Sequence, residues 1–150
     1  MIHKMKLQAK YFEYMINGTK RIEIRINDEK RQLIKIGDII EFERFSELND
    51  SFKTRVVELI RYNNFDELVK DFDISILADK SMTKSELINE LIQFYPEEKQ
   101  QKYGVLAIRI ELMWLYKKEE DFDVNPNCNA FFSKKFIFNP VYRLILSNIC

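Results

Sequence analysis

Three charged side chains that could do chemistry together stand close in the sequence, at Lys20, Glu23 and Arg25. Glu23 and Arg25 are two residues apart, which places them on one face of a β-strand. An ammonium beside a carboxylate can neutralise a phosphate or polarise a carbonyl, while the carboxylate accepts hydrogen bonds from a base or positions water. The guanidinium adds a planar fork for phosphate or a stacking face for a base. Spacing alone favours the simpler alternative of surface salt bridges, each worth about 0–1 kcal/mol.

The segments around these residues predict a helix, a turn and a strand. Residues 8–17 carry apolar and aromatic side chains on one helical face, namely Tyr11, Phe12, Met15 and Ile16. Asn17-Gly18 then provides the left-handed stop that ends many helices. Residues 21–26 alternate strictly between charged residues and isoleucine, which is the period of a half-buried strand. We expect the isoleucines to point inward, so that Arg21, Glu23 and Arg25 share the opposite face.

The rest of the first 112 residues predicts more strands than helices. Strands are expected at 39–44, 54–62 and 103–112, with a turn at 35–38 that uses Gly37. Helices are expected at 65–71 and after Thr83, each opened by a capping pair. No regular βαβ repeat is present. This order predicts an α+β domain built on a small, mostly antiparallel β-barrel with flanking helices.

Composition excludes several classes of protein. Acidic and basic residues balance at 24 each, which argues against a strong, non-specific grip on nucleic acid. A local excess of basic residues between positions 20 and 35 is either a solvated face or a local patch; it consists of Lys20, Arg21, Arg25, Lys30, Arg31 and Lys35. The two cysteines, Cys128 and Cys150, build neither a disulfide framework nor a metal site, and His3 is expected to be exposed. We therefore expect no metal and no cofactor.

No secretory segment follows Met1, and no apolar run reaches the roughly 18 residues that a membrane span needs. We therefore expect a cytoplasmic protein with no membrane partner. Residues 113–150 form an aromatic, asparagine-containing C-terminal appendage without a catalytic motif. It could pack on the domain, mediate dimerisation or be poorly ordered, and the oligomeric state does not follow from the sequence.

The run Gly18-Thr19-Lys20-Arg21-Ile22-Glu23-Ile24-Arg25 matches the Gly-x-Lys-x-x-Glu-x-Arg motif of the ASCH-domain family, relatives of the PUA RNA-binding fold. The likeness extends to the preceding helix at Tyr11-Phe12 and Ile16, to the turn Ile36-Gly37-Asp38 and to the final strand at Tyr103-Gly104-Val105. It covers residues 4–112, and the chain resembles the small bacterial members of the family.

This resemblance implies a PUA-like barrel with a cleft for RNA or a nucleotide, lined by Lys20, Arg21, Glu23 and Arg25. The family also includes a small bacterial amidohydrolase that removes the acetyl group from N4-acetylcytidine with a lysine, a threonine and a glutamate. The lysine corresponds to Lys20, the threonine position holds Glu23, and the third position falls near Asp79. Two of the three positions therefore differ or are shifted, so the resemblance does not by itself carry this activity over.

Three functions remain open from the sequence. The first is a module that binds RNA or a modified nucleoside or nucleotide, and a cleft for one nucleotide fits the zero net charge better than a long backbone groove. The second is a metal-independent hydrolase for an acylated nucleoside, with Lys20 and Glu23 as catalytic groups and Asp79 as a third member. The third is a non-catalytic protein-interaction domain that uses the aromatic appendage. Three aromatic side chains could stack on a base or belong to the core, namely Tyr11, Phe45 and Tyr103.

Overall fold

A curled five-stranded sheet organises the protein, and the strand order across it is β1-β3-β4-β5-β2. The computed structural model describes residues 1–45 and 50–113. The strands are β1 (Ile2–Leu7), β2 (Ile22–Ile26), β3 (Ile39–Arg44), β4 (Ser51–Tyr62) and β5 (Val105–Leu112). β1 runs parallel to β3, and the other three pairs are antiparallel. The expected α+β class with a mostly antiparallel, barrel-like sheet is confirmed.

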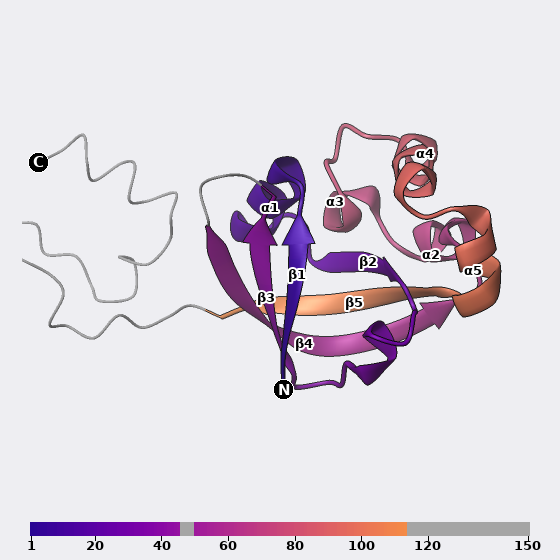
Figure 1. The fold of residues 1–150 in the computed structure, drawn as a ribbon. Coiled ribbons are helices and arrows are strands. Elements are labelled where there is room, and N and C mark those ends of the chain that lie inside the picture. The colour runs from indigo at the N-terminus through magenta and orange to yellow at the C-terminus, as the bar shows by residue number, and fades with distance from the viewer. Residues whose placement is uncertain (46–49, 114–150) are drawn as a thin grey trace, which may run out of the picture. The chain divides into compact units, whose positions relative to one another are not determined.

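The sheet does not close, because β1 and β2 are its two edge strands. Helix α1 (Ala9–Ile16) lies beside the end of β1, whereas the later helices gather together on the side of β2 (Figure 1). These are α2 (Phe65–Asp71), α3 (Ile74–Leu77), α4 (Lys84–Phe94) and α5 (Glu97–Tyr103), and a short 3-10 helix, η1, spans Arg31–Leu33. The open seam between β1 and β2 is therefore flanked by α1 and by the α2–α5 group.

Both predicted capping pairs form. The Asn64 side chain accepts a hydrogen bond from the Glu67 amide at the start of α2. Thr83 and Glu86 make a complete capping box at the start of α4. At the end of α1, Gly18 adopts a φ of +79°, as the Asn17-Gly18 pair predicted. This left-handed residue turns the chain sharply from α1 toward β2.

The two faces of β2 are both buried, which corrects the expectation of a half-exposed strand. Residues paired across antiparallel strands share a face. Ile24 pairs with Ala107, and both belong to the core that packs against α2, α3 and α4. Glu23 pairs with Ile108 and Arg25 with Leu106, whose side chains belong to the other core, inside the curl of the sheet. The isoleucines thus face the helices, and the charged residues face the interior of the curl.

Strand β1, which precedes the helix expected at 8–17, was not predicted from the sequence. Met5 and Leu7 of β1 are buried in the core inside the curl. His3, expected to be exposed, is only 8% exposed, and its Nε2 lies 2.8 Å from Asp38 Oδ2. The expectation for His3 is therefore wrong, because this polar side chain occupies an inward position of the strand and finds its partner in the turn before β3.

No helix in the described part of the chain is long and apolar enough to cross a membrane. The predicted appendage at 113–150 lies outside the described residues, except for Met113.

Candidate functional site

A cavity of about 400 Å³ lies at the open seam of the sheet. Its walls come from the end of β1, from α1, from β2 and from α4, and Phe45 joins them just after β3. Pockets for small ligands commonly measure about 300–1,000 Å³, so the space is of the size that holds one small molecule or one unit of a polymer. Lys20, Glu23 and Arg25 all line it, so the structure brings together the three residues that the sequence singled out.

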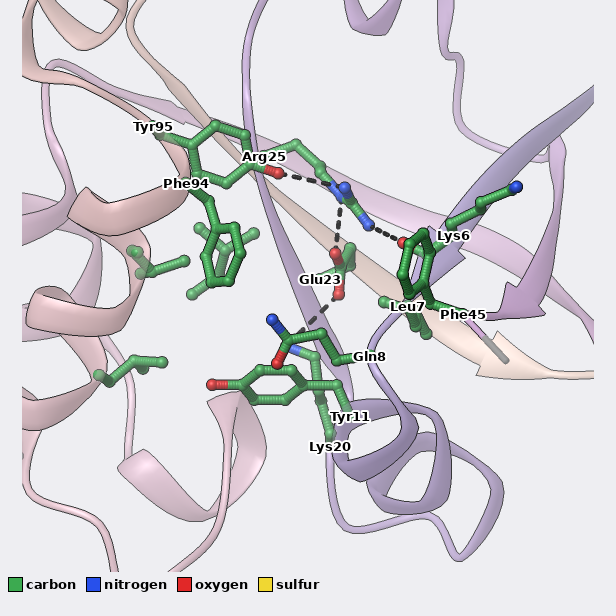
Figure 2. Close-up of a pocket in the computed structure, with 13 residues that line it drawn as sticks. Lys6, Leu7, Gln8, Tyr11, Lys20, Glu23, Arg25, Phe45, Phe94 and Tyr95 are labelled. Atoms are coloured by element: carbon green, nitrogen blue, oxygen red, sulfur yellow. Dashed lines mark hydrogen bonds and ion pairs between the residues drawn. The ribbon is translucent and has the colours of Figure 1, made fainter. Parts of the chain in front are cut away.

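Lys20 is 5% exposed and lines the cavity beside Tyr11 (Figure 2). The turn after α1 fixes its backbone, since the Lys20 amide donates to the Tyr14 carbonyl at 2.8 Å. The Nζ donates to the carbonyls of Ile22 at 2.5 Å and Leu77 at 2.7 Å. It also lies 3.5 Å from Glu23 Oε2. An ammonium has three protons, and the protein supplies one acceptor for each of the three protons of Lys20.

Glu23 and Arg25 form the next link, and Arg25 spans the open seam. Arg25 Nε lies 2.7 Å from Glu23 Oε1 as an ion-pair contact, although the angle does not make it a directed hydrogen bond. One terminal nitrogen of Arg25 donates to the Lys6 carbonyl at the end of β1 at 2.8 Å. The other donates to the Tyr95 hydroxyl, just after α4, at 3.1 Å. Figure 2 shows this chain of contacts running from Lys20 through Glu23 to Arg25.

Burial and charge act in opposite directions on the two cations. Burial lowers the pKa of the Lys20 ammonium below its ordinary value, and the neighbouring Glu23 carboxylate only partly offsets this. For Arg25, burial also disfavours the charged form, but Glu23 and Tyr95 outweigh it and the pKa is raised. With all three groups ionised, two cations and one anion leave a net charge of +1 in the cavity wall. Such an array favours a ligand that brings negative charge.

A second polar network ties α4 to α1 beside the cavity. The Tyr11 hydroxyl donates to Glu90 Oε2 at 2.7 Å, and Lys10 Nζ lies 2.6 Å from Glu90 Oε1. Burial, together with the bond to Glu90, raises the pKa of Tyr11. The ring of Tyr11 is held 5.4 Å from Lys20 Nζ, within the range of a cation–π contact. The position of Glu90 could not be predicted, because no local pattern in the sequence shows that α4 packs beside α1.

Two aromatic side chains line the cavity while remaining exposed. Phe45 is 72% exposed and Phe94 is 55% exposed. Exposed aromatic rings that line a pocket offer apolar faces to a ligand. Lys6 also lines the cavity, with its Nζ 5.9 Å from the centre of the Phe45 ring. The mouth of the cavity therefore combines aromatic faces with a positive charge.

Other candidate residues from the sequence lie elsewhere. Arg21 is exposed and donates from its Nε to the Gly18 carbonyl at 3.0 Å, so it does not line the cavity. Asp79 accepts bonds from the amide and hydroxyl of Ser81 at 2.7 and 2.6 Å, and it lines a separate hollow. These bonds lower the pKa of Asp79, which acts locally to cap a turn. Tyr103 donates to Glu29 at 2.9 Å outside the cavity.

The local excess of basic residues does not form one exposed patch. Lys20 is buried, Arg25 has a side chain only 14% exposed, and Arg31 Nη1 lies 3.0 Å from Asp28 Oδ2. Across residues 1–45 and 50–113, no group of three or more histidine, cysteine or acidic side chains is placed to hold a metal ion.

The open, mostly antiparallel sheet with a charged cleft at its seam defines a PUA-like α+β domain. A sequence profile of the ASCH domain matches residues 5–113, and the chain belongs to the ASCH domain family. This is a PUA-like fold family that is often linked to RNA binding. No curated protein matches the chain.

Solved structures give the same fold. The crystal structure of a hypothetical protein, PH0355, is 38% identical with a TM-score of 0.68, and the match covers 75% of this chain and 100% of that one. The solution structure of PF0455 from Pyrococcus furiosus is 38% identical with a TM-score of 0.61, covering 75% of this chain and 98% of that one. A ZmASCH mutant protein from Zymomonas mobilis is 8% identical with a TM-score of 0.54, covering 73% and 68%, and this match concerns the fold alone.

The unusual surroundings of Lys20 are testable by an NMR pH titration of the lysine side-chain signals. We expect the Lys20 signal to titrate below the ordinary value of 10.5, because burial disfavours the ammonium. In Glu23→Gln the midpoint should fall further, since the carboxylate that supports the charge is gone. The signal is assigned by its absence in Lys20→Arg. A midpoint at or above 10.5 in the unmodified protein would show that the charge is not disfavoured.

The same shift has a consequence for stability. Between the folded pKa of Lys20 and 10.5, the unfolded chain binds this proton and the folded protein does not. The contribution of Lys20 to the free energy of unfolding therefore rises with pH across that window.

Proposed function

We propose that the cavity binds one nucleotide of an RNA chain, with the base inside and the phosphate toward the mouth. The observation that carries this proposal is the buried array of Lys20, Glu23 and Arg25 in a cavity of about 400 Å³. A buried carboxylate flanked by two cations offers both an acceptor and positive charge at one place. A nucleotide presents the matching groups, a base edge that hydrogen-bonds and a phosphate that is negative.

The lining of the cavity supports a flat, partly apolar ligand. Leu87, Leu91 and Phe94 of α4 form one side, and the Tyr11 ring lies near Lys20 on the side of α1. Single-stranded RNA is commonly recognised by unstacked bases that pack on aromatic side chains. Stacking of a base on an aromatic ring contributes about 1–3 kcal/mol. The exposed rings of Phe45 and Phe94 are placed to contact the bound base or its neighbour in the chain.

The charge of the protein supports a weak and local interaction. The net charge of the whole chain is zero, so the affinity cannot rest on a general attraction to the RNA backbone. The excess charge at the cavity is +1, and Lys6 at the mouth adds another positive group. We therefore expect modest affinity with a shallow dependence on salt, dominated by contacts to one or two nucleotides.

Binding of a short single-stranded RNA, followed by fluorescence anisotropy at low salt, tests the proposal. Arg25→Ala and Phe94→Ala should each weaken binding by roughly 1–3 kcal/mol, about 5- to 150-fold, because a charge-assisted contact or a stacking face is lost.

Arg21→Ala is the matched control, since it removes an exposed arginine four residues away that does not line the cavity. Ile36→Ala removes an apolar side chain that is 67% exposed and also does not line the cavity. Both controls should bind as the unmodified protein does. Loss of binding in Arg21→Ala with no effect of Arg25→Ala would place the RNA elsewhere, and an absence of binding at low salt would refute the proposal.

A second candidate function is hydrolysis of an acylated nucleoside such as N4-acetylcytidine. The observation that favours it is the buried ammonium of Lys20 with a lowered pKa, 3.5 Å from the Glu23 carboxylate, since perturbed groups of this kind concentrate at catalytic sites. Glu23 would take a proton from water as the water oxygen adds to the acetyl carbonyl, and it would return that proton to N4 as the C–N bond breaks, which gives cytidine and acetic acid, the latter ionising to acetate. Lys20 would act by holding Glu23 in place, because its protons are directed to protein acceptors.

Chromatography of N4-acetylcytidine incubated with a high concentration of the protein tests this second candidate. Turnover that disappears in Glu23→Gln and persists in Asp79→Asn would assign the reaction to the cavity. Asp79→Asn is the control because Asp79 lines a different hollow. An absence of turnover at enzyme concentrations that would reveal slow rates would refute this second candidate and favour nucleotide binding.

A further inference from the structure

The main-chain groups of β2 alternate between two directions. In an antiparallel pair, residues that exchange hydrogen bonds with the partner strand alternate with residues whose amide and carbonyl point away from it. The Asn27 amide donates to the Gly104 carbonyl, and the Ile110 amide donates to the Arg21 carbonyl, both at 3.0 Å. By the register of β2 with β5, the odd-numbered residues of β2 therefore bond to β5. The even-numbered residues, 22, 24 and 26, turn their amide and carbonyl groups away from β5, toward the open seam.

Two occupied carbonyls show that this direction leads to the cavity. The Ile22 carbonyl accepts from Lys20 Nζ, and the Lys6 carbonyl at the end of β1 accepts from Arg25. Both donor side chains line the cavity. The two cations that flank Glu23 thus each cap one main-chain carbonyl, one on either side of the seam.

Ile24 leaves an open amide and carbonyl at this edge of β2. It is 4% exposed, and its side chain belongs to the core that packs against the later helices. Of the three residues of β2 that turn toward the seam, Ile24 alone lines the cavity. Within the described part of the chain, neither its amide nor its carbonyl has a hydrogen-bond partner. Buried main-chain groups are nearly always paired with protein, water or ligand, so this pair is open to a ligand in the cavity.

The open pair is short, which decides the kind of group that fits it. An extended peptide that adds to a sheet edge bonds to successive edge-facing residues, and here Lys20 already takes the carbonyl of the preceding one, Ile22. A nucleic-acid base needs only one donor and one acceptor side by side, and the hydrogen-bonding edge of each RNA base carries such a pair. An ionised phosphate offers acceptors alone, and it would leave the Ile24 carbonyl without a donor.

We propose that a base enters the cavity edge-on and is held by the amide and carbonyl of Ile24, in the place that a further strand would take. This binding mode deepens the proposed function and rests on it, since a nucleotide must enter the cavity. The group recognised at the edge is the base, and the phosphate stays toward the positive charge at the mouth. A base bound there lies beside Glu23 and Arg25, the neighbours of Ile24 in β2.

Amide hydrogen exchange of the full chain, measured by NMR with and without a short single-stranded RNA, tests this binding mode. In the free protein, the Ile24 amide should exchange faster than the amides of Glu23 and Arg25, which bond to β5. At saturation with RNA, exchange at Ile24 should slow roughly fivefold or more, because a hydrogen bond to the base forms. The Ile26 amide is the matched control and should change little, since it also points away from β5 but does not line the cavity.

Two small probes separate the base from the phosphate. Cytidine 5′-monophosphate should shift the Ile24 amide signal as it is titrated into the full chain. Ribose 5-phosphate, which lacks the base, should leave that signal unchanged at the same concentrations.

The outcomes separate this binding mode from the function on which it rests. RNA that binds without slowing exchange at Ile24, or that slows Ile26 equally, would overturn the binding mode while leaving RNA binding intact. It would also be overturned by an equal shift of the Ile24 signal with ribose 5-phosphate, or by exchange at Ile24 in the free protein as slow as at Glu23 and Arg25. Failure of both RNA and cytidine 5′-monophosphate to bind would remove the proposed function and the binding mode together.

Discussion

The burial of one carboxylate between two cations is the constraint on which the site depends. An ionised group taken out of water must be paired, and removing one partner of a buried pair commonly costs about 3–5 kcal/mol. Glu23 meets this requirement through Lys20 on one side and Arg25 on the other. Lys20 also donates to the Leu77 carbonyl at the end of α3, and Arg25 donates to the Lys6 carbonyl at the end of β1. A single charge cluster thus links segments far apart in the sequence.

The open seam of the sheet explains why such a cluster is tolerated inside a small domain. The core inside the curl is mostly apolar apart from this cluster and the buried His3, and Ile108 and Leu106 are the strand partners of Glu23 and Arg25. If β1 and β2 paired, the space between them would be filled by backbone hydrogen bonds. Instead Arg25 crosses the gap with its side chain, and α4 stands beside it through Tyr95. The result is a largely apolar cavity with a charged cluster in its wall, which is the composition typical of small-ligand sites.

Much of the fold could be predicted, because its elements follow local patterns. Strand β3 and helix α2 have the bounds that alternation and capping predicted, and the capping box at Thr83 opens α4. Strand β1 was missed because His3 interrupts its apolar side, and the partner that makes His3 acceptable, Asp38, is 35 residues away. Helix α5 could not be predicted from apolar spacing, because its residues Glu97–Tyr103 are almost all polar.

The candidate site was predicted only where local spacing and a sequence motif marked its residues. Lys20, Glu23 and Arg25 could be chosen because spacing and the motif Gly-x-Lys-x-x-Glu-x-Arg both marked them. Period-two alternation also grouped Arg21 with them, but Arg21 precedes β2 and turns to solvent.

The residues supplied by α4 could not be predicted, because no local pattern shows which helix will cover a cleft. Glu90, Phe94 and Tyr95 reach the site only through the packing of α4 beside β2 and α1. Contacts of this kind depend on long-range packing, which local sequence patterns do not predict.

The central claim is that an RNA base enters the cavity and meets Glu23 and Arg25. The most direct measurement is an NMR titration of the full chain with a short single-stranded RNA, observing the Arg25 Nε–H signal and the rings of Tyr11 and Phe94. The account predicts that these signals shift together and that the rings show cross-relaxation with protons of one base. Shifts confined to exposed basic residues such as Arg21 and Lys30, with the cavity signals unchanged, would contradict it.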